Sequence, residues 1–202
     1  MKAAALHCPD CGAPASPDAR QCGYCGARLA TVQCPACFGP AFVGMRHCPA
    51  CGAALAREEA PDEEAKLACP RCSGALEPIR LEANRLRECA GCGGLWIDNR
   101  TFFALCRARD RQAEAARADG QPAPLRPGPS ALDLPVRYLH CPLCRTLMNR
   151  VNFYGTSGVL LDVCPEHGHW LDQGEMQRVM EFVGWRGFYR GTFIPSFWQG
   201  GG

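Results

Sequence analysis

The sequence predicts a series of small, metal-stabilised, β-rich modules, and three observations lead to this fold class. Sixteen cysteines in 202 residues is far above ordinary usage. Most of them fall into Cys-x-x-Cys knuckles that recur along the chain, and hairpin and helix patterns accompany only the later knuckles. Modules of roughly 25 residues bury too little core to fold unaided, so metal or disulfides must hold them.

The cellular compartment decides between metal and disulfides. Residues 1–7 lack the apolar stretch of a signal peptide, and no run of residues has the length and apolarity of a membrane span. We therefore expect a cytoplasmic protein without membrane contact, whose reduced thiols bind metal. Disulfides are the disfavoured alternative. So is a thioredoxin-like redox pair, because the βαβ context is missing.

The segment 1–56 contains a tandem repeat, in which the cysteine spacing that begins at Cys8 recurs from Cys34. Two knuckles supply the four ligands of a structural zinc site. Ten-residue gaps within each set favour pairing of successive knuckles over a cross-brace. Phe38 stands where the other Cys-Pro-x-Cys words of this region have glycine. The predicted ligands of the first two sites are Cys8, Cys11, Cys22, Cys25, Cys34, Cys37, Cys48 and Cys51.

A second repeat follows a different plan. Each unit opens with a Cys-Pro-x-Cys knuckle and closes with a second knuckle and a Trp-hydrophobic-Asp word. In the last site His167 takes the place of the fourth cysteine, and His169 is the rival ligand. Three cysteines and one histidine form a normal structural zinc shell. The predicted ligands are Cys69, Cys72, Cys89 and Cys92 in the third site, and Cys141, Cys144, Cys164 and His167 in the fourth.

The residue types at the knuckles fit a metal turn. Glycine follows the second cysteine at Gly12, Gly26, Gly52 and Gly93, where a tight turn needs positive φ. Tetrahedral sulfur sites suit zinc or iron, and we expect four zinc ions with iron as the alternative. Four protein ligands per site leave no open position for substrate or water, which a catalytic zinc requires.

Strand patterns predict a hairpin in each of the last two modules. Residues 75–81 and 85–89 pair around the turn 82–84, and residues 147–153 and 159–164 pair across 154–158. The Trp96 and Trp170 rings are expected to pack over these ribbons.

A helix follows each hairpin. The first begins after Asp98 and carries Cys106 on its apolar face, where we expect a buried thiol that binds no metal. The second begins at Asp172, whose spacing from Glu175 resembles a capping box, and Gly184 is expected to end it.

These patterns divide the chain into six segments. Both linkers are expected to be tethers, and the aromatic stretch from Trp185 to Trp198 either folds back onto the fourth module or binds a partner. The predicted segments are a double ribbon at 1–56, an acidic linker at 57–66, a ribbon with helix at 67–118, a proline-rich linker at 119–131, a second ribbon with helix at 132–190, and an aromatic, glycine-rich tail at 191–202.

The formal charge of +2 treats every cysteine as neutral, whereas zinc ligands are thiolates. Fifteen thiolates and four zinc ions add about −7, which brings the metallated chain near −5. Bulk charge therefore does not favour non-specific binding to nucleic acid.

The motifs resemble two zinc families. Cys8 to Leu55 is similar to the double zinc ribbon family, with Phe38 as the departure. Cys69 to about Cys106 and Cys141 to about Val183 each resemble the bacterial domain named after the TFIIB transcription-factor zinc finger, with His167 as a departure. These resemblances imply tandem zinc ribbons, built of knuckles and β-hairpins, the last two each followed by a short helix. They imply zinc binding, and by themselves say nothing of transcription.

Together, these patterns predict a non-catalytic zinc-binding protein that acts as a protein-interaction adaptor, with no small-molecule substrate. The alternative is a nucleic-acid-binding or transcription-associated role, based on the arginines of residues 80–111. A metal or redox sensor is the third hypothesis.

Overall fold

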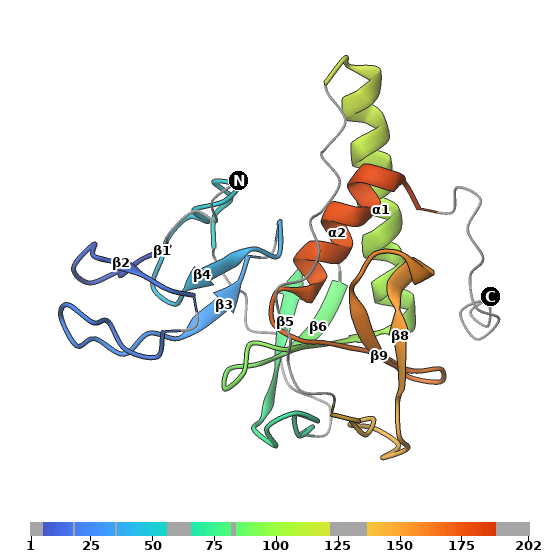
Figure 1. Cartoon of the computed structure of the whole chain (residues 1–202), viewed down its shortest axis with the longest axis horizontal. Helices are drawn as coiled ribbons and strands as arrows, with labels where there is room; N and C mark the ends of the chain where they lie inside the picture. The colour runs from blue at the N-terminus through green and yellow to red at the C-terminus, as the bar shows by residue number, and fades with distance from the viewer. Residues whose placement is uncertain are drawn as a thin grey trace.

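The computed structural model describes residues 6–17, 19–34, 36–55, 66–81, 84–121 and 137–188. Most of both predicted linkers (57–65 and 122–131) and the predicted tail 191–202 lie outside these residues. The described chain confirms the predicted fold class, because small β-rich modules carry the four cysteine clusters and a helix follows each of the last two (Figure 1).

The first two modules are minimal ribbons with one short antiparallel pair each. In the first module β1 (Leu6–His7) pairs with β2 (Pro14–Ala15), and in the second β3 (Thr31–Gln33) pairs with β4 (Pro40–Phe42). Their second knuckles are closed by single bridges between residues 21 and 28 and between 47 and 54. A small core that includes Leu6, Leu29 and Phe42 lies between the two modules.

The third and fourth modules share one antiparallel sheet. The third contributes β5 (Leu76–Leu81), β6 (Asn84–Cys89) and β7 (Leu95–Asp98), and the fourth contributes β8 (Asn149–Asn152), β9 (Leu160–Cys164) and β10 (Gly168–Leu171). A short 3₁₀ turn, Phe153–Gly155, follows β8. The strand order is β5-β6-β7-β10-β9-β8. From either edge inward, the sheet therefore runs through the first, second and third strand of one module, and the two third strands meet in the middle. Both predicted hairpins are confirmed, with slightly shorter strands in the fourth module.

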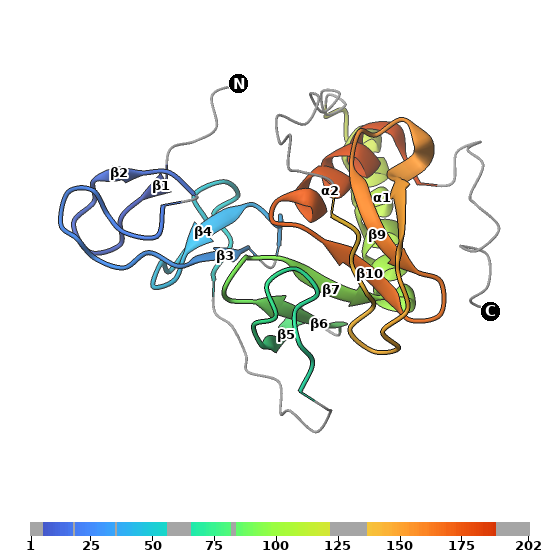
Figure 2. The same ribbon diagram turned by 60° about the horizontal axis from the view of Figure 1, so that its bottom comes forward.

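The joint between these modules is the pairing of β7 with β10, which lie side by side in Figure 2. In this pairing Trp96 lies opposite Trp170. Sequence patterns describe two separate ribbons and give no sign of this joint. Each third strand has one edge that its own hairpin does not cover. Unpaired edge groups invite pairing with another strand, and here each module supplies the missing partner of the other.

Helices α1 (Asn99–Ala118) and α2 (Glu175–Arg186) pack against each other on one face of the sheet (Figure 1). The predicted start of α1 is confirmed, since the Asp98 carboxylate accepts a hydrogen bond from the Thr101 N–H at 2.9 Å. This is the side-chain cap that an aspartate at this position supplies.

The predicted limits of α2 are wrong. The helix begins at Glu175 behind a left-handed Gly174, and Asp172 gives no side-chain cap. Only half of the expected capping box forms, with the Asp172 N–H donating to Glu175 Oε2 at 2.8 Å. Gly184 lies inside the helix, which ends at Arg186. A Cβ at Gly184 would come within 2.5 Å of Arg109 Nη2, so this glycine makes room for the α1 guanidinium.

The sheet has a different core on each face. Between the sheet and the helices lies the larger core, which includes Ile97, Phe102 and Leu171. On the other face, Trp96 and Trp170 are buried together with Cys69, Cys89, Cys141 and Cys164 of the third and fourth clusters. The expectation that both tryptophans pack over the ribbons is therefore confirmed. Cys106 is fully buried in the helical core, as predicted.

Candidate metal centres

The first three predicted ligand sets each form a compact group of four sulfur atoms. Within each set the four atoms lie within 4.8 Å of one another. Zn–S bonds of about 2.3 Å in a tetrahedron place neighbouring sulfurs about 3.8 Å apart, and the observed separations fit this geometry. The measured pairs are Cys8–Cys25 3.7 Å, Cys11–Cys22 3.7 Å, Cys34–Cys51 3.6 Å, Cys37–Cys48 3.7 Å, Cys69–Cys92 3.6 Å and Cys72–Cys89 3.4 Å.

Successive knuckles form each set, as the spacing predicted, and no cross-brace occurs among the four groups. All sixteen cysteines lie within the described residues and all are free thiols. A disulfide needs sulfurs about 2.05 Å apart. The donor set is therefore available to a metal.

The fourth group contains Cys141, Cys144, Cys164 and His167. His167 Nδ1 lies 3.4 Å from the Cys164 sulfur, and Cys144 and Cys164 are 3.8 Å apart. The rival, His169, lies elsewhere. Its ring is buried and stacks on Phe102 at a centroid distance of 4.2 Å, and burial lowers the pKa of His169 to about 3.

Backbone N–H groups point at the cysteine sulfurs. In the second site the N–H groups of Ala36 and Gly39 lie 3.4 Å from the sulfurs of Cys34 and Cys37. Such N–H groups stabilise the thiolate form that binds metal. Four clustered sulfurs still cannot all ionise without a cation, because like charges at this distance repel. A divalent zinc ion supplies the missing positive charge, so the four groups fit four zinc ions.

The pKa values within the clusters show this competition. Backbone N–H groups of Cys25 and Tyr24 lower the pKa of Cys22 to about 6. Contact with Cys92 lowers the pKa of Cys69 to about 5. Burial raises the pKa of Cys141 to about 12. Hydrogen bonds thus lower the pKa of some cluster thiols, whereas burial raises the pKa of others.

The residue that follows a Cys-x-x-Cys knuckle has positive φ in both the first and the second knuckles, whether or not it is glycine. The predicted glycine turns are confirmed, with φ of 75° at Gly12, Gly26 and Gly52 and 67° at Gly93. Three other residues adopt the same conformation without being glycine: Phe38 at 59°, Ser73 at 62° and Arg145 at 63°. The turn geometry thus does not depend on glycine, although a side chain there is strained.

Phe38 shows why one of these positions departs from glycine. Its ring is 4% exposed and belongs to the core between the sheet and the helices, together with Leu81, Leu105 and Met180. The second ribbon therefore packs onto the joined sheet through this side chain. The sequence shows this departure from glycine but not its role, because the residues that contact Phe38 lie far along the chain.

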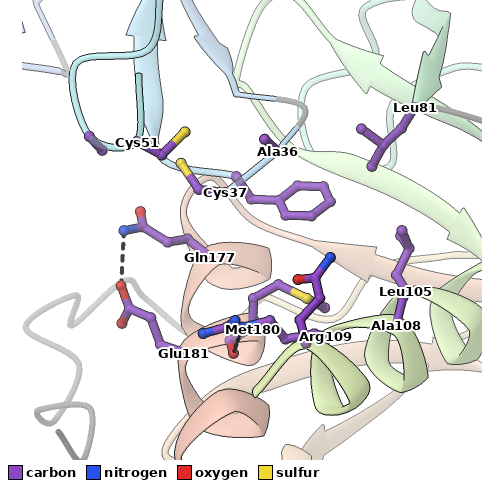
Figure 3. A pocket seen from close by; sticks show the side chains of 13 residues that line it. Ala36, Cys37, Cys51, Leu81, Leu105, Ala108, Arg109, Gln177, Met180 and Glu181 are labelled. Atoms are coloured by element: carbon purple, nitrogen blue, oxygen red, sulfur yellow. Dashed lines mark hydrogen bonds between the residues drawn. The ribbon is translucent and has the colours of Figure 1, made fainter. Parts of the chain in front are cut away.

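Two hydrogen bonds from Gln33 reinforce the same contact. The Gln33 N–H donates to Glu88 Oε1 at 3.1 Å, and its side-chain amide donates to the Gly93 carbonyl at 2.7 Å. Beside Phe38 a hollow of about 450 Å³ remains between the second zinc site and the two helices. Figure 3 shows Cys37 and Cys51 on one side of it and Arg109, Gln177 and Met180 on the other.

An ion pair links the third and fourth sites. Arg71, inside the first knuckle of the third module, pairs with Asp172 at the end of the fourth module's ribbon. Asp172 also accepts a hydrogen bond from Trp170 Nε1 at 3.0 Å. The same indole packs on Gly94, where a Cβ would lie 2.2 Å from Trp170 Cζ2. Gly94, the second glycine after Cys92, is therefore required by the Trp170 ring of the fourth module.

Comparison with known proteins agrees with this geometry. Residues 8–52 match the double zinc ribbon family, and residues 68–108 and 140–181 each match the transcription factor zinc-finger family of TFIIB type. The chain thus carries one match to the double zinc ribbon and, after it, two matches to the TFIIB-type zinc ribbon. No curated protein and no solved structure matches the chain. Neither helix in the described part of the chain has the length and apolarity needed to cross a bilayer.

Proposed function

We propose that this protein is a non-catalytic, cytoplasmic adaptor in which zinc fixes the shape of surfaces that bind other proteins. The observation that carries the proposal is that each cluster brings together four protein ligands. Such shells hold structure, whereas a catalytic zinc keeps a position open. The proposed ligands are the sixteen predicted residues, including His167.

The contacts between modules support an adaptor. Phe38 and Gln33 attach the second ribbon to the joined sheet, and the ion pair of Arg71 with Asp172 braces the third site against the fourth. Zinc binding in small modules is coupled to folding. The knuckles at the ends of the ribbons therefore occupy fixed relative positions, which lowers the entropy cost of binding a partner.

A pull-down of the tagged, zinc-loaded chain from its native host extract, with and without nuclease, tests the proposal. Protein partners that survive nuclease treatment support an adaptor. Absence of any such partner contradicts it. Metal analysis of the purified chain should give four zinc ions, and two or fewer would contradict the proposed ligand sets.

Binding to nucleic acid is the second candidate, and one observation favours it. Arg80 and Arg85 lie directly opposite each other in the β5–β6 hairpin, and both are exposed. Like charges at facing positions are destabilising, and a bound phosphate would relieve their repulsion. This candidate predicts partners lost on nuclease treatment and an affinity for DNA or RNA that falls steeply with salt. Replacing both arginines with glutamine should then reduce that salt dependence.

A further inference from the structure

The first knuckles of the third and fourth modules are built alike. A single bridge closes each one, Ala68 with Ala75 in the third and His140 with Leu147 in the fourth. In both knuckles the N–H of the first cysteine donates to a carbonyl across the turn. The distance is 2.7 Å from Cys69 N to Gly74 O and 2.8 Å from Cys141 N to Thr146 O. The third knuckle therefore shows which residues this turn needs for folding.

The buried positions of the two knuckles agree in chemistry. Leu139 and Met148 of the fourth knuckle are buried, and their counterparts are Leu67 and Leu76. Both pairs are joined by the same backbone hydrogen bond of 2.9 Å. These apolar residues lie under the zinc site and stabilise the ribbon.

The exposed positions differ. Tyr138, Leu143 and Leu147 are 64%, 48% and 52% exposed. Their counterparts in the third knuckle are Lys66, Arg71 and Ala75, which are charged or small. The fold does not require large apolar side chains here, because the matching turn in the same protein lacks them. Of the six large hydrophobic residues exposed in the described ranges, three lie on this one knuckle.

The charged residues of this knuckle segment are basic. Arg137 and Arg145 are exposed, and residues 137–149 contain no aspartate or glutamate. The next acidic residues along the chain are Asp162, which is buried, and Glu166 on the second knuckle of the same site. Aromatic and arginine side chains are typical anchors of protein interfaces, and positive rims favour negative partners.

We propose that five of these residues form a docking surface, the fourth-knuckle surface, composed of Tyr138, Leu143, Leu147, Arg137 and Arg145. Its partner is a protein segment that presents apolar side chains flanked by aspartate or glutamate. The apolar groups pack on the tyrosine and leucines, and the carboxylates pair with the two arginines. This inference rests on the proposed adaptor function and identifies the surface and the partner's chemistry.

The test exchanges the surface for its counterpart within the full-length, zinc-loaded chain. The variant Tyr138→Lys/Leu143→Arg/Leu147→Ala carries residues that the third knuckle already tolerates. A matched control, Tyr24→Lys/Val43→Lys, removes exposed apolar residues from the double ribbon. Both variants should keep four zinc ions and the wild-type unfolding midpoint. Capture of nuclease-resistant partners should fall at least about tenfold for the fourth-knuckle variant and stay unchanged for the control.

A photo-reactive leucine analogue at position 143 identifies what touches the surface. Cross-links to an acidic segment with interspersed apolar residues support the inference. Cross-links to a second copy of this chain, to its own residues 57–66 or to nucleic acid overturn it. If partners survive nuclease but the fourth-knuckle variant captures them as well as wild type, the surface is wrong and the adaptor function stands. If no partner survives nuclease, the adaptor function itself fails.

Discussion

Replacing Phe38 with glycine gives this knuckle the residue that follows the other two Cys-Pro-x-Cys words of the double ribbon, Gly12 and Gly52. The substitution tests how the second ribbon is attached. Two effects oppose each other at this position. Removing a buried phenylalanine ring costs about 3–5 kcal/mol. Removing a side chain from the left-handed region, where φ is 59°, returns about 1–2 kcal/mol. The net loss is about 1–4 kcal/mol, and we expect it in the attachment of the ribbon and not in its zinc site.

The backbone amide of Gln33 reports the attachment directly, because its N–H donates a hydrogen bond to the Glu88 carboxylate across the interface. A loss of about 1–4 kcal/mol should speed its hydrogen exchange by roughly 5- to 900-fold. The knuckle amide of Ala36, which points at the Cys34 sulfur, should keep its protection. Nuclear magnetic resonance of the zinc-loaded chain measures both amides in one experiment.

Two control variants separate burial from backbone strain. Ser73 and Arg145 occupy the same turn position with φ of 62° and 63°, and both side chains are exposed. Ser73→Gly and Arg145→Gly lose no buried contact, so each should stabilise the protein by about 1 kcal/mol. If Phe38→Gly were also stabilising, or left Gln33 exchange unchanged, the reasoning about the Phe38 contact would be refuted.

Three further predictions concern the joined sheet and its core. Gly94→Ala places a Cβ 2.2 Å from Trp170 Cζ2, and thermal or urea unfolding should show a loss of about 1–3 kcal/mol. Burial, followed by repulsion from Asp172, raises the pKa of Glu175 from 4.5 to about 8. The folded state therefore holds a proton that the unfolded state releases, and its stability falls as pH rises from about 5 to 8; the stabilisation given by Glu175→Gln should grow through that window and then level off. Cys106→Ser buries a hydroxyl in the apolar core and should cost about 1–3 kcal/mol in urea unfolding, with the zinc content still four.

Each of these predictions has its own control and its own contrary result. A Cβ added at Gly23 would meet open space, and the φ of this residue is not positive. Gly23→Ala should therefore be neutral, and an equal loss there would discount the Trp170 contact. For Glu175, parallel pH profiles of wild type and variant would contradict burial of the carboxyl group. Zinc content that drops to three in Cys106→Ser would mean that this cysteine is a ligand after all.

Much of the local structure follows from the sequence because its causes are local. The Cys-x-x-Cys spacing brings two sulfurs to one point within a single turn, and the recurrence of the Cys8–Cys25 spacing at Cys34–Cys51 assigns the knuckles to sites. Asp98 caps its helix through a hydrogen bond to a residue only three positions away. The predicted start of α2 was wrong for a physical reason. The Asp172 carboxylate accepts a hydrogen bond from Trp170 and pairs with Arg71, so it does not cap the helix N–H groups.

Residue patterns alone predicted the four clusters of cysteine and histidine side chains, the hairpins and both helices, because each depends on residues close together in the chain. The pairing of β7 with β10, which joins two ribbons into one sheet, and the attachment of the double ribbon through Phe38 become visible only in the folded chain. A backbone edge can pair with any strand that presents a matching edge, so its partner leaves no residue pattern. Burial of Phe38 likewise depends on side chains as distant along the chain as Leu81 and Met180, which become its neighbours only when the modules have come together.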